Sequence, residues 1–226
     1  MEGLFQKLDE MLSLLVHNGK THLGPIKGYA SLIQDDNEAD ANTRRWADKI
    51  ARNVRRMEDY FEMLNSYGIR GAVGASELSW QRLVAGVMDR FAAVNVKGVP
   101  IEIVNYTRGT FVQHGELLKR VLTHLVVNGY ESIESTGKLS LTIEEAGKWD
   151  DGKRRFVVRV SDTGCGIERK NANLIWEPFY STKHDHAGLG LPYVAAVAPI
   201  LGMEVDVESR PGRGTTVGLV LSEQGG

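Results

Sequence analysis

Three short segments in the second half of the chain combine residue types that bind nucleotides. The segment DTGCGI (Asp162–Ile167) places a carboxylate before closely spaced glycines, and AGLGL (Ala187–Leu191) places glycines at the expected start of a helix. Between them lies EPFYSTK (Glu177–Lys183). Glycine lets a base or a phosphate approach the backbone, and the N–H groups at a helix start bind phosphate. Each segment is common alone, but this ordered set predicts a nucleotide pocket.

Asp162 follows the apolar run FVVRV and precedes the glycines Gly164 and Gly166. A carboxylate in this position is suited to accept a hydrogen bond from an exocyclic amine such as that of adenine. A simple turn at the end of a strand is the alternative interpretation. Cys165 lies in the same loop, where a packing role is favoured over that of a reactive thiol.

A polar face of a helix expected over 116–135 carries candidate ligands. His124, Asn128 and Glu131 are spaced i, i+4 and i+7, so they share a face separate from the apolar stripe. Magnesium prefers hard oxygen donors and bridges phosphate oxygens, which makes Asn128 a candidate metal ligand. A solvated polar face is the alternative. Lys183, which precedes the glycines of AGLGL, could reach phosphates as part of a lid, or could be an ordinary surface lysine.

Composition excludes several functional classes. The 226 residues are 42% hydrophobic and 25% charged, and the formal net charge of −2 gives no basic footprint for nucleic acid. The single cysteine excludes an intramolecular disulfide and fits a reducing compartment. The chain has no run of about 18 apolar residues. We therefore expect a cytoplasmic fragment without membrane contact, whose membrane anchor, if the protein has one, lies in a portion outside this sequence.

The N-terminal part predicts a helical hairpin. One amphipathic helix is expected over 4–34 and a second over 42–65, joined by the polar turn 34–41. A two-helix hairpin buries its apolar stripes poorly alone, so pairing into a dimeric four-helix bundle is expected, with packing on a neighbouring domain as the alternative. The expected seam of the first helix consists of Phe5, Leu8, Leu12, Leu15, Gly19, His22, Ile26, Tyr29 and Ile33. The expected inner stripe of the second consists of Trp46, Ile50, Val54 (or Asn53), Met57, Phe61 and Leu64.

The rest of the chain predicts an α+β sandwich, a sheet with helices on one face. The expected domains are a hairpin over 1–67, a glycine-containing linker over 68–76 and a mixed domain over 77–226. Helices are expected over 80–92, 116–135 and 190–200. Strands are expected over 100–105, 138–145, 156–161, 204–208 and 215–221.

Two histidines in the first helix are candidates for nucleophilic chemistry. His22 falls on the expected seam, whereas His17 lies two positions past Leu15 and is expected to face outward. An exposed imidazole keeps one nitrogen unprotonated at neutral pH and can act as a nucleophile. Beside a nucleotide-binding domain, His17 becomes a candidate phosphoryl acceptor.

These segments together resemble a known family. Residues 17–29, HNGKTHLGPIKGY, resemble the acceptor-histidine box of bacterial sensor histidine kinases, especially the nitrogen-regulatory type. Residues 122–132, LTHLVVNGYES, resemble their asparagine box. The glycine segments and GRGTT (Gly212–Thr216) resemble the remaining ATP-site boxes of the superfamily that includes gyrase, Hsp90 and MutL, the GHKL fold. The resemblance covers about residues 5–222.

The resemblance implies a homodimeric kinase that uses ATP and Mg²⁺ and transfers phosphate to a response-regulator receiver domain. It implies that His17 is phosphorylated, that Asn18, Lys20 and Thr21 belong to the catalytic group, and that Thr21 serves a phosphatase activity. Asn128 is the implied metal ligand. The implied nucleotide-binding set is His124, Asn128, Glu131, Asp162, Gly164, Gly166, Lys183, Gly188, Gly190, Leu191 and Thr216.

The sequence also departs from the family pattern. Asn18 stands where an acidic residue usually follows the acceptor histidine, and an amide cannot take a proton at pH 7. His124 stands where the asparagine box usually begins with asparagine, and His186 or Ala187 stands where a further glycine is common. These departures leave open an alternative function, a dimeric docking scaffold with a weakened ATP pocket.

Overall fold

The computed structural model divides the chain into two compact units, residues 1–71 with 178–189, and residues 72–177 with 190–226. The residues that it describes are 2–36, 38–67, 75–95, 97–105, 107, 109–149, 151–183 and 188–223.

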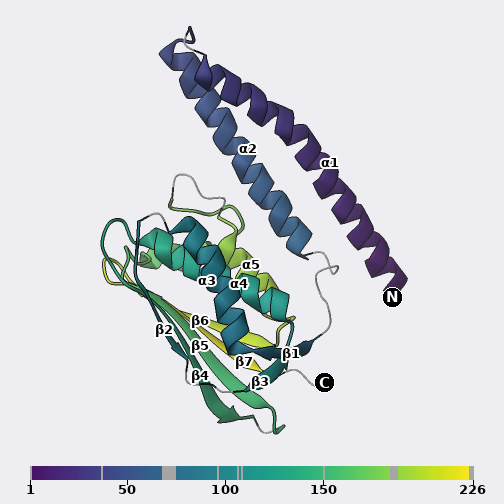
Figure 1. The fold of residues 1–226 in the computed structure, drawn as a ribbon, viewed down its shortest axis with the longest axis vertical. Helices are drawn as coiled ribbons and strands as arrows, with labels where there is room; N and C mark the ends of the chain where they lie inside the picture. The colour runs from purple at the N-terminus through teal and green to yellow at the C-terminus, as the bar shows by residue number, and fades with distance from the viewer. Residues whose placement is uncertain are drawn as a thin grey trace. The chain divides into compact units, whose positions relative to one another are not determined.

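The first unit contains the expected helical hairpin, formed by α1 (Glu2–Asp35) and α2 (Ala41–Tyr67) (Figure 1). Lys27 and Glu58 form an ion pair of 2.8 Å between the two helices. Gly19 lies against the ring of Phe61, at a distance that leaves no room for a β-carbon. The described side chains that the hairpin buries are small or medium in size: Val16, Leu23, Ala30, Ala47, Ala51 and Val54.

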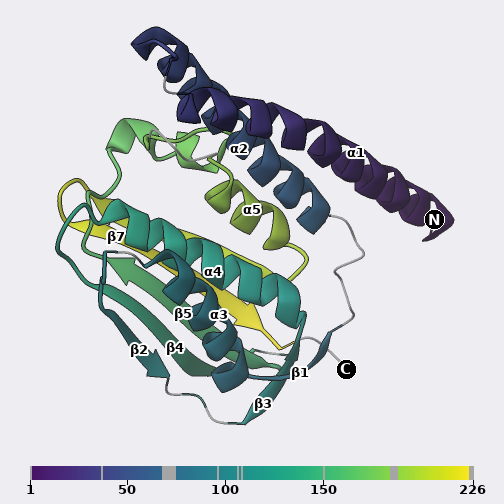
Figure 2. The same ribbon diagram turned by 45° about the horizontal axis from the view of Figure 1, so that its top comes forward.

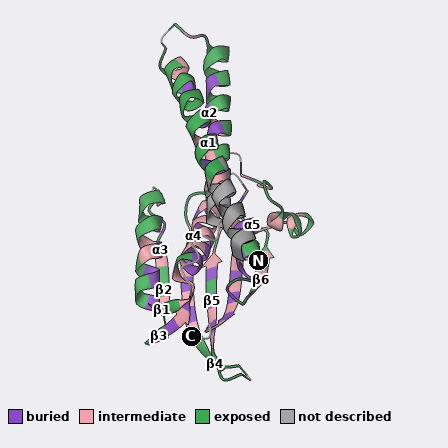
Figure 3. Cartoon of the chain, turned by 90° about the vertical axis from the view of Figure 1, so that its right-hand side faces the viewer, coloured by how far each residue is buried: buried purple, intermediate pink, exposed green. Residues whose placement is uncertain are grey.

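The expected seam is only partly the contact within the hairpin: Gly19, Phe61 and Val54 lie in it as expected, whereas several bulky residues are exposed in the single chain. Much of α1 and α2 is exposed (Figure 3). Tyr29 is 68% exposed and Trp46 61% exposed, and Ile26, Ile50 and Met57 are also exposed. Small side chains at the contact let the two helices approach closely, which leaves the bulky apolar residues on another face. His22 is exposed as well, so it does not lie in the seam. The side chains of Phe5, Leu8, Leu12, Leu15 and Leu64 lie outside the described residues.

The second unit contains a five-stranded sheet in the order β2-β4-β5-β7-β6 (Figure 2). Strands β2 and β4 are parallel, and the other neighbours are antiparallel. Alternate residues point to one buried face, as in Leu139, Leu141 and Ile143 of β4. The strands are β2 (Ile101–Asn105), β4 (Leu139–Lys148), β5 (Arg154–Asp162), β6 (Met203–Arg210) and β7 (Gly214–Ser222).

Helices α3 (Trp80–Val94), α4 (Gly115–Ser132) and α5 (Gly190–Val197) cover the buried face of this sheet (Figure 2). Ser79 caps α3 by accepting a hydrogen bond from the backbone N–H of Arg82. The described residues also include the short 3₁₀ helices η2 (Arg169–Asn171) and η3 (Leu174–Trp176). This architecture confirms the expected α+β sandwich.

The structure differs from the expected elements in several places. Strands β1 (Ser76–Ser79) and β3 (Thr110–Gln113) were not expected, because four-residue strands show little alternation. Strand β1 begins within the expected linker, whose residues 68–74 lie outside the described ones. Helix α5 ends at Val197 rather than at 200, because Pro199 disfavours helical backbone before it and cannot donate a hydrogen bond. Helix α4 ends at Ser132 rather than at 135.

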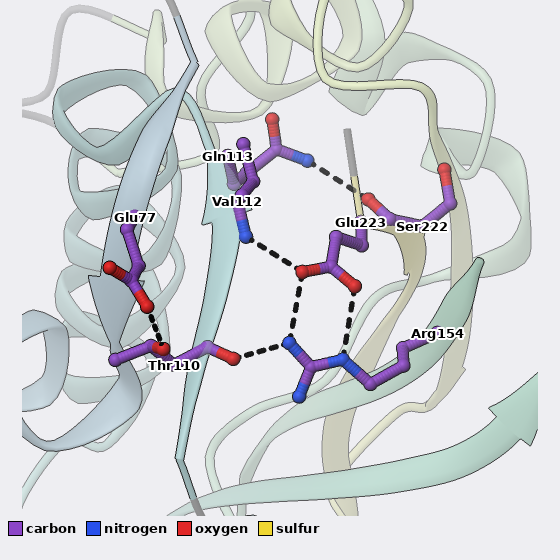
Figure 4. Close-up of polar contacts among 7 residues, drawn as sticks. All are labelled: Glu77, Thr110, Val112, Gln113, Arg154, Ser222 and Glu223. Carbon is purple, nitrogen blue, oxygen red and sulfur yellow. Dashed lines mark hydrogen bonds and ion pairs between the residues drawn. The ribbon is translucent and has the colours of Figure 1, made fainter. Parts of the chain in front are cut away.

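The small β1–β3 sheet is joined to the large sheet by a polar cluster (Figure 4). Glu223 accepts hydrogen bonds from the Arg154 guanidinium at 3.0 and 2.9 Å and from the Val112 N–H at 3.1 Å. Arg154 also donates to the carbonyl of Thr110. The Arg154 hydrogen bond, with the Val112 N–H adding to it, lowers the pKa of the Glu223 carboxyl. Buried Gln113 donates to the carbonyl of Ser222, which completes the junction.

Candidate functional site

Asp162 stands at the end of β5, and its carboxylate is held by two donors. The Oδ1 atom accepts a hydrogen bond from the Ser132 hydroxyl at 2.7 Å and another from the Gly164 N–H at 2.8 Å. Strand β5 fixes the Asp162 backbone and α4 supplies Ser132. The expected base-recognition carboxylate is therefore oriented by two elements distant in sequence.

Glycines let the turn after Asp162 pack against neighbouring backbone. Gly166 has a φ of 68°, and a β-carbon there would overlap the carbonyl of Arg210. Gly214 has a φ of 94°, and a β-carbon there would overlap the carbonyl of Asp162. Positive φ and the lack of space both require glycine at these two positions. The turn is thus tightly built, as a base-binding wall requires.

Thr216 lies on β7 opposite Ser161, the residue before Asp162, so its side chain and that of Asp162 point to opposite faces of the sheet. Ser161 is the register partner of Thr216, and the two hydroxyl groups are 2.9 Å apart. The Thr216 side chain is half-buried. It lies on the opposite face of β7 from the side chain of the buried residue Val217. Its predicted role beside the base stays a prediction.

Asn128 lies against the start of α5, the helix that AGLGL was expected to open. A β-carbon on Gly190 would lie 2.9 Å from Nδ2 and 3.1 Å from Oδ1 of Asn128. The amide of the candidate metal ligand and the helix start predicted to meet phosphate are therefore in contact. Leu191 is the second residue of α5 and is half-buried, and Glu131 is half-buried on α4.

His124 is half-buried on α4 and its ring packs against α5. Its ring lies 4.8 Å from the ring of buried Tyr193 on α5. Burial, with the charges of Arg120 and Arg90 adding to it, lowers the pKa of His124 from 6.5 to about 4. The imidazole is thus neutral at physiological pH and joins α4 to α5.

Lys183 and Gly188 lie in 178–189, which belongs to the other unit. The Phe179 N–H donates to the carbonyl of Gly188 at 3.0 Å and closes the base of this segment. Phe179 has a φ of 70°, which is strained for a residue with a side chain. The approach of Lys183 and Gly188 to a nucleotide stays a prediction. His184, His186 and Ala187 lie outside the described residues.

His17 is exposed on α1, as expected for an acceptor. Thr21, one turn later, donates its hydroxyl proton to the His17 carbonyl at 2.9 Å, and Asn18 is exposed beside His17. Lys20 is half-buried. Because His22 is also exposed, solvent access does not distinguish between the two histidines. The choice of His17 stays a prediction.

Asn128 is the side chain that fits a magnesium ion best. Among the described residues no group of three or more His, Cys, Asp or Glu side chains could hold a metal. A site built from one amide oxygen, phosphate oxygens and water suits Mg²⁺, which keeps several waters and needs no protein cage. The donor chemistry therefore fits an ion that arrives with the nucleotide.

A shallow groove of about 300 Å³ lies elsewhere in this unit, between η3, α5 and β6. Its lining is mostly apolar and includes neither Asp162 nor Asn128, so it offers no polar chemistry. The lining residues are Trp176, Ala195, Ala198, Pro199, Met203 and Val205.

Residues 113–225, half of the chain, match the family model described as "Histidine kinase-, DNA gyrase B-, and HSP90-like ATPase". The chain belongs to this ATPase family. The match includes the turn at Asp162, Asn128 and the start of α5. The family match thus spans the site described above, and the binding of a nucleotide by these particular residues stays a prediction.

Relatives matched over the chain are sensor histidine kinases. The signal transduction histidine-protein kinase AtoS of Escherichia coli (strain K12) is 23% identical over 95% of this chain and 34% of its own length. The sensor histidine kinase ZraS of Klebsiella oxytoca is 35% identical over 48% of this chain and 22% of its own length. The chain thus spans about a third or less of these two relatives. The chain is therefore similar to a part of these histidine kinases, and the nitrogen-regulatory subtype stays a prediction.

Solved structures show the same fold. Full-length ShkA in complex with AMPPNP matches 96% of this chain and 46% of its own, with a TM-score of 0.66 and 23% identity. The catalytic domain of the histidine kinase ThkA matches 67% of this chain and 97% of its own, with a TM-score of 0.58 and 21% identity. Within the described residues, every helix is too short or too polar to cross a bilayer.

Ser132 is the site residue that the sequence interpretation missed. Ser132 is the last residue of the segment LTHLVVNGYES, one helical turn after Asn128, and no role was predicted for it. An i, i+4 spacing from Asn128 was the available signal, since it places Ser132 near the same face of α4. Its contact with Asp162 depends on the sheet, which the local sequence does not specify.

Proposed function

We propose that this chain is the catalytic core of a histidine kinase. It binds Mg-ATP in the second unit, phosphorylates His17 and passes the phosphoryl group to an aspartate of a response-regulator receiver domain. It works as a homodimer in the cytoplasm, paired through the hairpin. The observation that carries the proposal is the contact of Asn128 with the start of α5, in the unit that also holds the oriented carboxylate of Asp162.

The chemistry expected of His17 is nucleophilic. An unprotonated imidazole nitrogen forms a bond with the γ-phosphorus, and the bond from this phosphorus to the β–γ bridging oxygen breaks. ADP leaves with the electron pair, and the second imidazole nitrogen loses its proton to a base. In the second step the receiver carboxylate attacks the phosphorus and His17 leaves.

The remaining residues bind and orient. Asp162 accepts the hydrogen bond of the adenine amine, Thr216 contributes to recognition of the base, and the N–H groups at Gly190 face phosphate oxygens. Asn128 would hold Mg²⁺ through its amide oxygen, and the bound ion would neutralise phosphate charge. Lys183 approaches the phosphates from the 178–189 segment. Positioning and charge stabilisation of this kind supply most of the rate in phosphoryl transfer.

Asn18 sets the expected balance of activities. An amide cannot remove the proton that His17 loses, so autophosphorylation is expected to be slow, whereas Thr21 retains the hydroxyl associated with orienting water for dephosphorylation. Replacing Asn18→Glu is expected to raise the autophosphorylation rate. An unchanged or lower rate would contradict this interpretation.

A docking scaffold with a degenerate ATP pocket is the other function considered from the sequence. The family match and the tightly built turn at Asp162 argue against a degenerate pocket. Thermal unfolding with and without Mg-ATP separates the two, because a ligand that binds the folded state stabilises it. No shift at millimolar Mg-ATP would favour the scaffold.

The direct test is incubation with γ-labelled ATP and Mg²⁺, comparing the wild-type chain with His17→Gln and His22→Gln. Acid-labile label is expected on the wild type and on the His22 variant, and none on the His17 variant. His22→Gln is a matched control because both histidines are exposed on α1. Label lost only with His22→Gln would assign the acceptor role to His22.

A further inference from the structure

Ser132 joins the helix that carries Asn128 to the turn that carries Asp162. It is the last residue of α4, and its hydroxyl lies 2.7 Å from Oδ1 of Asp162. Its carbonyl accepts a hydrogen bond from the Cys165 N–H at 3.0 Å. Gly164 packs so closely on Ser132 that a β-carbon there would overlap the hydroxyl and the carbonyl. Ser132 therefore contacts the DTGCGI turn through both its side chain and its backbone.

The hydroxyl of Ser132 has one proton and two acceptors within reach. The Gly129 carbonyl and Asp162 Oδ1 are both 2.7 Å away. An ionised carboxylate is the stronger acceptor, since hydrogen bonds to charged groups are about twice as strong as neutral ones. The Ser132 hydroxyl therefore donates its hydrogen bond to Asp162 Oδ1, rather than to the Gly129 carbonyl, whenever Asp162 is ionised.

Two donors on one oxygen fix the rotation of the Asp162 carboxylate. Ser132 and the Gly164 N–H approach the same atom, Oδ1, from α4 and from the turn. With Oδ1 held, the direction of Oδ2 is set as well. Oδ2 lies near the backbone of α4, because a β-carbon built on Gly129 would be 3.6 Å from it. A terminal carboxylate rotates over a broad range when nothing holds it.

We propose that Ser132 is a positioning residue that aims the Asp162 carboxylate at the exocyclic amine of the nucleotide base and so sets the preference for adenine over 6-oxo purines. This inference rests on the proposed nucleotide site. The 6-amino group of adenine donates a hydrogen bond to an aimed carboxylate oxygen. The 6-oxo group of hypoxanthine presents an acceptor to the same carboxylate, and two acceptors leave each other unpaired.

The test compares the binding of Mg-ATP and Mg-inosine triphosphate by calorimetry, using the full chain. Ser132→Ala is expected to weaken ATP binding about tenfold, the order expected for one hydrogen bond to a charged group, and to change inosine triphosphate binding less than about twofold. Ser132→Thr keeps the hydroxyl and is expected to restore the preference. Ser135→Ala, at an exposed serine beyond the end of α4, is the matched control and is expected to behave as wild type.

A kinetic measurement separates aiming of the base from general damage. For Ser132→Ala, the KM for ATP in autophosphorylation is expected to rise about tenfold while kcat changes less than about twofold, because the group that Ser132 aims does not touch the γ-phosphate. A purely structural role would lower kcat as well and would weaken both nucleotides equally.

The outcomes are distinct. Equal weakening of both nucleotides, or no change in either, overturns the role of Ser132 and leaves the proposed kinase function standing. Failure of the wild type to bind either nucleotide contradicts the proposed function itself. If circular dichroism shows that Ser132→Ala is unfolded, Ser132→Cys keeps the side-chain size with a weaker donor, and the same comparison of the two nucleotides decides.

Discussion

At the scale of single residues, the site depends on side chains whose local sequence suggests another role. His124 is spaced as a ligand beside Asn128, yet it is packed against Tyr193 and its pKa is lowered to about 4 by burial and by Arg120 and Arg90. A half-buried neutral imidazole orients the helix that carries Asn128, whereas a charged one would disrupt this packing. The substitution of the usual asparagine by histidine is therefore compatible with an intact site.

This environment predicts a pH dependence of stability. The unfolded chain protonates His124 near pH 6.5 and the folded chain only near 4, so the unfolded state binds more protons between these values. The free energy of unfolding is therefore highest, as far as His124 is concerned, above pH 6.5. It falls by roughly 2–3 kcal/mol as the pH decreases from 6.5 to about 4. His124→Phe keeps a ring against Tyr193 and is expected to remove this part of the pH dependence in urea unfolding. Equal slopes for both proteins would contradict it.

Gly190 lies against the Asn128 amide, so a side chain at this position is expected to disturb the candidate magnesium ligand. Gly190→Ala places a methyl group 2.9 Å from the Asn128 amide, which must move away from the start of α5. We expect Mg-ATP affinity to fall at least about tenfold, with a stability change of about 1 kcal/mol or less. Gly86→Ala is the matched control: this glycine lies within α3, where a β-carbon meets only the flexible Lys119 side chain. Calorimetric titration with Mg-ATP measures both, and equal affinities would show that Asn128 tolerates displacement.

At the scale of elements, the sequence predicted the long elements well and the short ones poorly. Helices α1 and α2 and strands β4, β5 and β7 follow clear periodic patterns, but β1 and β3 have four residues each and depend on pairing with each other. The glycine segments predicted the turn at Asp162 because conformation and close approach require glycine there. The contact of Ser132 with Asp162 could not be predicted, since it depends on how α4 lies on the sheet.

The hairpin of α1 and α2 leaves several bulky apolar side chains exposed, which the sequence pattern alone did not predict. Periodicity identified the apolar residues of both helices, but it did not show which of them meet within one hairpin, as Gly19 and Phe61 do, and which stay exposed. Trp46, Ile50 and Tyr29 are left exposed, as an interface between two copies requires. Ile50→Glu places a charge in this face and is expected to yield a monomer in analytical ultracentrifugation at micromolar concentration. Asn53→Glu, at an exposed polar position of α2, should remain a dimer.

At the scale of the whole molecule, the proposed acceptor His17 and the proposed nucleotide-binding residues Asp162 and Asn128 belong to different units. His17 lies in the first, and Asp162 with Asn128 lies in the second, which has its own sheet and buried core. Transfer from ATP to His17 therefore requires the units to come together, and the two functions are separable in principle.

This separation predicts the behaviour of the second unit alone. A fragment of residues 75–226 contains the second unit together with the segment 178–189, and it keeps the core residues Trp80, Phe111 and Phe156, whose rings pack together, and the Arg154–Glu223 junction. It is expected to fold, to bind Mg-ATP within about threefold of the full chain, and to acquire no acid-labile label. Added to a full chain carrying Asp162→Asn, it is expected to label that chain's His17 weakly, because tethering no longer concentrates the two units. Acid-labile label on the fragment alone would show that the acceptor lies within the ATP-binding unit and that the hairpin serves only for pairing.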